Sequence, residues 1–480
     1  MSQTRKIQRT ISRRSMLKLV GGSSLTLAAA ACGAATPTAA PTAKPAATAV
    51  PPTAAPPTAV PPTAAPTAVP TKAPTTIDWW TVPSADVGSQ AQQEALVAEF
   101  NKLSSKTSAL AKPTFLPDDG FSEKMTTVLG TGTGVPDVAT IVLDTWFPAA
   151  SDLRDLIARD KIDINVYAKN FFDTRCRFGE KIIGLPITVG ATMYFYNKAL
   201  FDSKGLKYPE WGYTMQQWLD DATKMTDRSK KIFGAAMPTR IWRGEFFAFG
   251  AKPISDDGKT VDGFINSAKS VKMFEFMYDL ATSGAVPTKA EFDVLRTEGT
   301  GPIDLFNTGR LGFAGLNNGQ FDQVDKAGVK FGLIHNPKVE GEDIFTNAWT
   351  LQLGIPAASK NRDAAWEYVK WLAGEPGQRF MMMNRNGAYT PPMPALWPDH
   401  PGKKDPRLDF FFKIIDSTRH VWEFAGKFPY FTKATRPSQD VYDGIYAGKI
   451  KRGDIKSELN NLVAPMQKIV DEERAKLGLK

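Results

Sequence analysis

The stretch that decides the fold spans residues 180–205 and reads EKIIGLPITVGATMYFYNKALFDSKG. Residues 181–185 are apolar and rich in β-formers, and Pro186 predicts an end to ladder pairing because proline has no backbone N–H. A second apolar run at residues 193–196 leads into a short helix that Gly205 ends. This order of strand, break, strand and helix predicts a hinge segment that crosses between two lobes. Two consecutive strands of a single sheet fit the local pattern equally well.

The first 32 residues carry the marks of an export signal. Residues 12–18, SRRSMLK, resemble the twin-arginine export motif, and residues 17–31 are apolar but too short to span a bilayer comfortably. The run that ends at Cys32 looks like a bacterial lipobox, with Ala29 at the position where leucine is usual. We therefore expect a signal peptide over residues 1–32 and a lipid on Cys32. An ordinary signal peptide with an incidental cysteine is the alternative.

Residues 33–75 consist almost entirely of alanine, proline and threonine. This segment has no acidic residue and too few bulky apolar side chains to bury a core, so we expect it to be disordered. A proline-rich chain of this kind is semi-rigid and extends by about 3.1 Å per residue. It therefore predicts a stalk of up to ~130 Å that holds a folded head away from a membrane surface.

The formal net charge of +9 arises from 59 lysines and arginines against 50 acidic residues. Eight of the basic residues and none of the acidic ones lie in residues 1–75, so the head has 51 basic and 50 acidic residues and a net charge of +1. This balance lacks the basic excess expected of a nucleic-acid-binding domain. The two cysteines are Cys32 and Cys176, so a lipidated Cys32 leaves no partner for an intrachain disulfide.

The head begins with an alternation of strands and helices. Strands are predicted over residues 76–81, near 114–116 and over 138–143, and helices over residues 92–103 and around 121–128. This order is typical of a doubly wound α/β sheet, in which ligands meet the carboxyl ends of the strands. The glycine-rich residues 130–134 do not predict a phosphate loop, because no Gly-Lys-Ser/Thr and no helix follow them.

Seven short motifs occur in a fixed order along the head and together resemble the family 1 extracellular solute-binding proteins. They are GVPDV at 134–138, EKIIGLP at 180–186, FYNK at 195–198, TMQQW at 214–218, DDGKT at 256–260, FNTGRLG at 306–312 and GIPAASKN at 354–361. These proteins are the sugar-binding components of ABC importers, such as the maltose- and multi-sugar-binding proteins. The likeness covers nearly all of residues 77–470. Within the fourth motif, Thr214 and Gln217 predict a capping box at the start of a helix.

The resemblance implies a periplasmic-binding-protein-like fold of type II, with two doubly wound α/β lobes joined by a multi-strand hinge. Lobe 1 would comprise residues 76–188 and 336–390, and lobe 2 would comprise residues 189–335 and 391–480. About three crossings would join the lobes, and these would lie near residues 186–193, 329–337 and 387–393. The ligand would lie in the cleft between the lobes.

The residues that bear chemistry point to binding and not to catalysis. The three histidines, His335, His400 and His420, are far apart in sequence and have no cysteine at ligand spacing, so we expect no metal site and no cofactor. No Gly-x-Ser-x-Gly elbow is present to anchor a catalytic triad. Carboxylate pairs suited to glycoside cleavage exist in any chain with 50 acidic residues, so a secreted glycoside hydrolase is one alternative.

Aromatic and acidic side chains at predicted strand ends and in loops form the candidate binding set. An indole face that covers a sugar ring contributes on the order of 1–2 kcal/mol, and a carboxylate accepts hydrogen bonds from sugar hydroxyls. The family resemblance places Trp146, Trp242 and Trp349 in cleft loops, whereas of Trp79 and Trp80 one should face inward and one outward. The candidate residues are Trp80, Asp119, Asp144, Trp146, Phe147, Trp242, Arg243, Glu245, Asn317, Trp349 and Tyr389.

These features together predict a lipid-anchored, non-enzymatic receptor on the outer face of the cell membrane. As a monomer it would capture a carbohydrate in the interlobe cleft, close around it and deliver it to the membrane subunits of an ABC permease. Arg243 either binds an anionic solute or pairs with Glu245. A receptor for a non-sugar solute, such as a glycerol phosphate ester or a polyamine, is therefore a second alternative beside the hydrolase.

Overall fold

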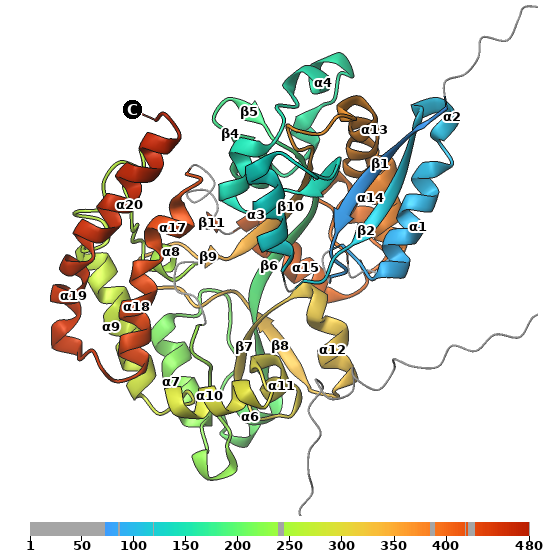
Figure 1. Cartoon of the computed structure of the whole chain (residues 1–480). Coiled ribbons are helices and arrows are strands. Elements are labelled where there is room, and N and C mark those ends of the chain that lie inside the picture. The colour runs from blue at the N-terminus through green and yellow to red at the C-terminus, as the bar shows by residue number, and fades with distance from the viewer. Residues whose placement is uncertain are drawn as a thin grey trace, which may run out of the picture. The chain divides into compact units, whose positions relative to one another are not determined.

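The computed structural model describes residues 73–84, 87–118, 120–238, 244–384, 389–417, 419–420 and 428–479. The expected signal peptide, the lipid attachment at Cys32 and nearly all of the stalk therefore lie outside the described residues. Within the described part, a seven-stranded sheet carries helices on both of its faces (Figure 1). None of the helices in this part is long and apolar enough to cross a bilayer.

The sheet has the strand order β2-β1-β3-β10-β6-β7, and β8 also pairs with β6. Its strands are β1 Thr75–Thr81, β2 Ala109–Phe115, β3 Val138–Thr140, β6 Leu185–Asn197, β7 Phe313–Asn317, β8 Phe331–Ile334 and β10 Ala348–Gly354. β1 pairs in parallel with β2 and β3, whereas the other pairs are antiparallel. The strand predicted over residues 76–81 is confirmed. The strand predicted near 114–116 begins earlier, at Ala109, because β2 pairs with β1 along its whole length.

The 13-residue strand β6 joins the two halves of the sheet. Its residues 185–191 pair with β10, and its residues 192–197 pair with β7 and β8. The predicted end of pairing at Pro186 is therefore wrong. The ladder shifts register at Gln352, which opposes Pro186 and leaves Ile187 as an extra residue, and a bulge of this kind tolerates a proline.

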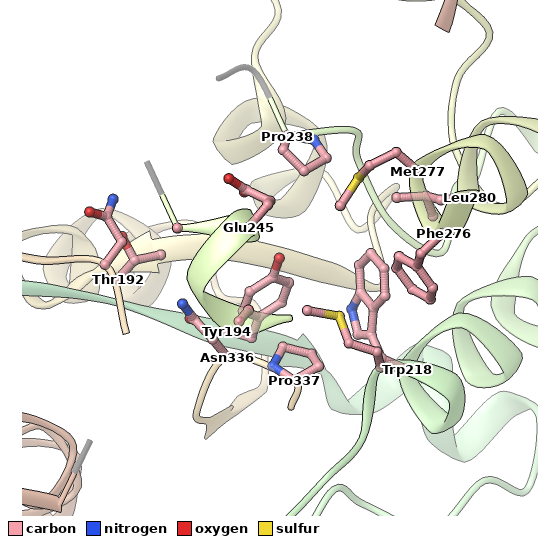
Figure 2. A pocket seen from close by; sticks show the side chains of 14 residues that line it. Thr192, Tyr194, Trp218, Pro238, Glu245, Phe276, Met277, Leu280, Asn336 and Pro337 are labelled. Atoms are coloured by element: carbon pink, nitrogen blue, oxygen red, sulfur yellow. The ribbon is translucent and has the colours of Figure 1, made fainter. Parts of the chain in front are cut away.

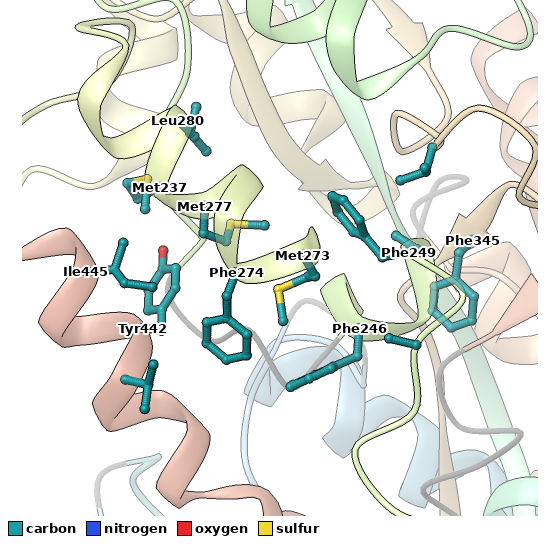
Figure 3. Close-up of a cluster of buried hydrophobic side chains, with 14 of the residues drawn as sticks. Met237, Phe246, Phe249, Met273, Phe274, Met277, Leu280, Phe345, Tyr442 and Ile445 are labelled. Atoms are coloured by element: carbon teal, nitrogen blue, oxygen red, sulfur yellow. The ribbon is translucent and has the colours of Figure 1, made fainter. Parts of the chain in front are cut away.

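Each half of the sheet is covered by apolar clusters on both faces. The half that contains β1, β2 and β3 lies between a core around Trp79 and a core around Trp80. The half that contains β7 and β8 lies between a core around Phe313 and a core around Phe195. Figure 3 shows part of the Phe313 core, where side chains of three helices meet. The long strand β6 contributes side chains to clusters in both halves of the sheet.

Helices accompany the strands in both halves. The first half carries α1 Gln90–Asn101, α2 Ser104–Thr107, α3 Phe121–Thr131, α4 Arg154–Arg159, α5 Lys169–Arg175, α13 Arg362–Ala373 and α14 Glu375–Asn384. The second half carries α6 Lys198–Ser203, α7 Met215–Met225, α8 Glu245–Ala248, α9 Ala268–Thr282, α10 Lys289–Thr297, α11 Pro302–Asn307, α12 Phe321–Lys326, α15 Pro406–Ser417, α17 Phe431–Thr435, α18 Pro437–Tyr446, α19 Ile455–Asn461 and α20 Val463–Lys476. Two short ladders lie outside the main sheet: β4 Arg177–Phe178 with β5 Lys181–Ile182, and β9 Phe345–Thr346 with β11 Arg419–His420.

The capping box expected before α7 is confirmed. The Gln217 N–H donates to Thr214 Oγ1 at 3.2 Å, and the Thr214 N–H donates to Gln217 Oε1 at 2.9 Å. These two bonds satisfy backbone donors that the first turn of a helix leaves free. The start of α7 at Met215 is therefore fixed, and with it the position of Trp218 three residues later.

Candidate functional site

The central strand β6 has one apolar face and one polar face. Its odd-numbered side chains are buried in a core that also contains residues of α15 and β7, and they are Val189, Ala191, Met193 and Phe195. The even-numbered positions point to the opposite face, because successive side chains of a strand alternate. On that face, Thr192 and Tyr194 are half-buried. The polar face of β6 is therefore partly open to solvent.

Neighbouring strands extend this polar face on both sides. On the β10 side, Trp349 lies opposite Gly190, and the Thr192 N–H donates to the Asn347 carbonyl oxygen at 2.8 Å. On the β7 side, Asn317 lies opposite Thr192. The result is a contiguous set of side chains that we call the hinge row, and its members are Trp349, Asn347, Thr192, Asn317 and Tyr194.

The Trp349 indole packs directly on the backbone of Gly190. A Cβ atom added at Gly190 would lie 2.5 Å from both Cε2 and Cζ2 of the indole, closer than real Cβ atoms approach their neighbours. Only glycine at position 190 therefore allows the ring its present place. Trp349 is half-buried, so part of its side chain remains exposed as a surface for the apolar face of a ligand.

The hinge row leads into a cavity of about 110 Å³ (Figure 2). The cavity is lined by Thr192, Tyr194, Met215, Trp218, Pro238, Gly244, Glu245, Ala248, Phe276, Met277, Leu280, Asn336, Pro337 and Asn347. In Figure 2 the polar side chains of Thr192, Glu245 and Asn336 lie on one side of Tyr194, and apolar side chains of α7 and α9 lie on the other. Pockets for drug-sized ligands begin at roughly 300 Å³, so this cavity can enclose part of a ligand and not a whole one.

The cavity lining includes buried polar atoms without a hydrogen-bond partner in the described part of the chain. Nε1 of Trp218 and Oδ1 of Asn336 are among them. The Trp218 side chain is well enclosed, since the residue is only 3% exposed. An unsatisfied buried polar group destabilises a protein by about 1–3 kcal/mol. Both atoms are therefore free to bond with a ligand group that reaches them.

Glu245, the first residue of α8, brings negative charge to the cavity. None of the fourteen lining residues is a lysine, an arginine or a histidine. Burial and then the charge of Glu245 raise the pKa of Tyr194, and the same two causes, in the same order, raise the pKa of Tyr442. The Tyr442 hydroxyl donates to the Pro238 carbonyl oxygen. Both phenols are therefore neutral at physiological pH and can donate hydrogen bonds.

The two histidines whose side chains are described are used in backbone contacts. Nε2 of His335 accepts from the Gly212 N–H at 2.7 Å, and Nδ1 of His400 accepts from the Gly402 N–H at 3.1 Å. Across the described ranges, no group of three or more His, Cys, Asp or Glu side chains is arranged to hold a metal ion.

Four aromatic residues of the predicted set are buried in apolar cores, and they are Trp80, Trp146, Phe147 and Tyr389. Trp146 is 1% exposed, packs edge-on against Phe121 and donates from Nε1 to Thr126 Oγ1 at 2.9 Å. The Tyr389 hydroxyl donates to the carbonyl oxygen of Ile187 at the bulge of β6. The structure thus places these four rings in the packing of the protein, because helices cover the strand ends that the sequence pattern left open.

The prediction that one of Trp79 and Trp80 faces outward is wrong. The two rings point to opposite faces of β1, but both faces are covered. Trp79 is fully buried against Tyr368, and the Lys124 ammonium lies 4.3 Å from the centre of the Trp80 ring. Nε1 of Trp80 donates to Asp78 Oδ2 at 2.7 Å, so its polar atom is satisfied within the protein.

Some predicted site residues lie outside the described residues. These are Asp119, Trp242 and Arg243, whereas Asp144 is described only by its backbone, which opens the 3-10 helix η2 Asp144–Ala149. The residues on either side of the 239–243 gap, Pro238 and Gly244, both line the cavity.

The structure brings three of the predicted residues together. Glu245 lines the cavity, and Trp349 and Asn317 belong to the hinge row. Oδ1 of Asn317 accepts from the Gly319 N–H at 2.9 Å, which fixes the orientation of the Asn317 amide at the end of β7.

The sequence patterns did not single out five other residues of the site: Thr192, Tyr194, Trp218, Asn336 and Asn347. The signal for the first two is the alternation in residues 189–195, VGATMYF, whose odd positions are apolar while the even positions hold Gly, Thr and Tyr. When residues 193–196 are treated as one apolar run, this alternation is missed. Asn336 and Asn347 lie in segments without a regular pattern, so no periodicity marks them.

Comparison with known proteins assigns the chain to a family. Residues 84–379, more than half of the chain, match the family described as bacterial extracellular solute-binding protein. The chain belongs to this family. The members of the family are non-catalytic receptors, and this solute-binding protein is accordingly a receptor and not a hydrolase.

Among characterised relatives, the solute-binding protein is similar to a galactooligosaccharide-binding protein from Bacillus subtilis. The two are 27% identical over 255 residues, which are 51% of this chain and 57% of the relative. A maltotriose-binding protein from Pyrococcus abyssi is 21% identical over 238 residues, 48% of each chain. The match thus spans about half the length of these relatives.

Solved structures match over nearly the whole described part of the solute-binding protein. An ABC substrate-binding protein from Listeria monocytogenes, in complex with cycloalternan, has a TM-score of 0.70 at 17% identity and covers 85% of this chain and 100% of its own. The sugar-binding protein MalE from Xanthomonas citri has a TM-score of 0.67 at 18% identity with the same coverage. These likenesses confirm the expected mixed α/β fold of the periplasmic-binding-protein kind, type II.

Proposed function

We propose that this solute-binding protein captures a carbohydrate on the hinge row and in the adjoining cavity. The observation that carries the proposal is the contiguous row of a half-exposed indole, hydroxyls and amides on the polar face of β6. A sugar ring has an apolar C–H face and an edge of hydroxyl groups, and the row offers a surface for each. The names of the two relatives, which bind a galactooligosaccharide and maltotriose, support the same class of ligand.

Titration calorimetry of the purified protein tests this proposal. Neutral mono-, di- and oligosaccharides form the panel, and a glycerol phosphate ester and a polyamine represent the competing classes. We expect a sugar to bind with a Kd of about 1 μM, which corresponds to about −8 kcal/mol. Micromolar binding of the ester or the polyamine, with no sugar bound at millimolar concentration, would contradict the proposal.

A variant in the middle of the hinge row tests whether the sugar binds at this face of β6. Thr192→Val removes a hydroxyl at little change in size, and we expect it to weaken sugar binding about tenfold because a sugar hydroxyl loses its partner. Thr282→Val is the matched control, since Thr282 lies at the exposed end of α9. The control should bind as the unaltered protein does.

We infer further that residues 76–188 and 336–390 form one lobe and that residues 189–335 and 391–480 form the other. The apolar clusters on both faces of each half of the sheet and the shared strand β6 support this division. In this proposal the monomer closes around the sugar and delivers it to the membrane subunits of an ABC permease.

The proposal includes twin-arginine export and a lipid on Cys32, which holds the stalk of residues 33–75 at the outer face of the membrane. Its support is the N-terminal sequence alone. We expect Cys32→Ala to move the protein from the membrane fraction to the soluble extracytoplasmic fraction. Retention of the variant in the membrane fraction would rule out the anchor.

A further inference from the structure

The unsatisfied atoms of Trp218 and Asn336 have opposite hydrogen-bonding roles. Nε1–H of Trp218 is a donor on α7, and Oδ1 of Asn336 is an acceptor on the segment that follows β8. Figure 2 shows the two side chains on either side of Tyr194. A ligand group that satisfies both atoms must therefore present an acceptor in one direction and a donor in another.

The cavity also has an apolar wall on the side of Trp218. Phe276, Met277 and Leu280 project from α9 and line it. Met277 and Leu280 are almost completely buried, so this wall is shielded from solvent. A small apolar group that moves from water to this apolar wall would be stabilised by the hydrophobic effect.

We propose that the cavity holds the acetamido group of an N-acetylated amino sugar. The acetamido oxygen accepts from Trp218 Nε1–H, the acetamido N–H donates to Asn336 Oδ1, and the methyl group packs against the apolar wall. The C=O and N–H of a trans amide point in opposite directions within its plane, so one acetamido group can accept from one partner and donate to another. This inference rests on the proposed function, because the sugar ring that carries the group would lie on the hinge row.

Other common sugar substituents satisfy fewer of these groups. A hydroxyl has no apolar part to place against α9. A protonated amine would be attracted by Glu245, but it has no lone pair with which to accept from Trp218 Nε1–H. A carboxylate cannot donate to Asn336 and would meet the like charge of Glu245.

Matched sugars test the inference by titration calorimetry with the purified full chain. The three pairs are N-acetylglucosamine with glucose, N-acetylgalactosamine with galactose, and triacetylchitotriose with cellotriose. In the two monosaccharide pairs one acetamido group replaces one hydroxyl, and in the trisaccharide pair three acetamido groups replace three hydroxyls. Glucosamine serves as the amine control. We expect the acetamido member of at least one pair to bind at least ~10-fold more tightly than its partner.

Trp218→Phe removes the donor and keeps an aromatic ring. We expect the affinity for the acetamido sugar to fall about tenfold, with the affinity for the matched hydroxyl sugar unchanged. Trp366→Phe is the control, because Trp366 is also buried on a helix but donates from Nε1 to Asp160 at 2.8 Å, outside the cavity lining. Asn336→Ala at a half-buried position tests the acceptor separately, so the test survives if Trp218→Phe does not fold.

The outcomes separate the inference from the proposed function. If a sugar binds but no acetamido member is preferred, or if glucosamine binds more tightly than N-acetylglucosamine, the acetamido assignment is overturned and the proposed function stands. If no sugar binds at all, both are overturned. An acetamido preference that persists in both Trp218→Phe and Asn336→Ala also overturns the assignment of this group to the cavity.

Discussion

The position of the Trp349 indole in the hinge row depends on a single neighbouring residue, Gly190. The ring occupies the space that a side chain at position 190 would fill, with the nearest atoms 2.5 Å from an added Cβ. A methyl group there must displace the ring, because the strand backbone on its other side is held by the β6 and β10 ladder. The glycine therefore leaves the space in which the Trp349 ring lies.

We predict that Gly190→Ala weakens sugar binding at least ~10-fold and that the same substitution has no further effect when Trp349 is already alanine. The four proteins of this double-mutant cycle are compared by titration calorimetry. Gly130→Ala is the control, since an added Cβ on this residue of α3 meets nothing within 4 Å. If Gly190→Ala lowers the sugar affinity equally with Trp349 present and with Trp349→Ala, the glycine is needed for the strand backbone and not for the position of the ring.

Trp146 and Trp349 show why the sequence predicts only part of the site. Both are tryptophans that the family resemblance assigns to cleft loops. Trp146 is buried with its nitrogen bonded to Thr126, whereas Trp349 is half-exposed. What separates them is the set of residues that packs on each ring from distant parts of the chain, and this is a property of the fold and not of the local sequence.

The segment that follows β8 contains the buried His335, whose two ring nitrogens both contact the backbone. Nε2 of His335 accepts from the Gly212 N–H at 2.7 Å, and Nδ1 lies 2.7 Å from the Asn336 carbonyl oxygen, which requires a neutral ring with its proton on Nδ1. Burial first, and then the positive charges of Lys338 and Lys413, lower the pKa of His335, although the bond with Asn336 opposes the shift.

We predict that the free energy of unfolding falls as the pH drops below 6.5, the ordinary histidine value. Because the pKa of His335 is lower in the folded state, the unfolded chain takes up a proton first, so the stability present above this pH is lost below it. The slope is at most about 1.4 kcal/mol per pH unit for one histidine. Burial also lowers the pKa of His400, which adds to the slope in the same direction.

Urea unfolding at about pH 7.5 and about pH 5.5 measures this loss. His335→Gln keeps an acceptor for the Gly212 N–H but cannot titrate, so its stability should change less between the two pH values. A loss of the same size in the variant would assign the pH dependence to other groups.

The strand β6 also shows how far element-level prediction reaches. The helix after it, the capping box of α7 and the strand–helix order of the first half are confirmed because each depends on neighbouring residues. The break predicted at Pro186 fails because its outcome depends on β10, which accommodates the proline with a bulge. Long-range pairing thus overrides a local rule at the point where the two halves of the sheet meet.

Closure around the sugar is the prediction that belongs to the whole molecule. If the two halves of the sheet move as bodies about the crossings, a saturating sugar that contacts both should favour the more compact arrangement. We expect the radius of gyration from small-angle X-ray scattering to fall when the sugar is added. The same sugar added to Thr192→Val at a concentration far below its weakened Kd serves as the control, and unchanged scattering of the saturated protein would contradict closure.

The shared strand has a consequence for how the chain reaches its native state. Residues 185–191 find their ladder partner in β10, which is made more than 150 residues later. Pairing over such a separation is slow, and until β10 arrives one edge of β6 presents unpaired N–H and C=O groups to any other strand. A ribosome that stalls between these two strands would therefore release a fragment prone to aggregation, whereas one that finishes the chain releases a protein whose exposed edge has been closed.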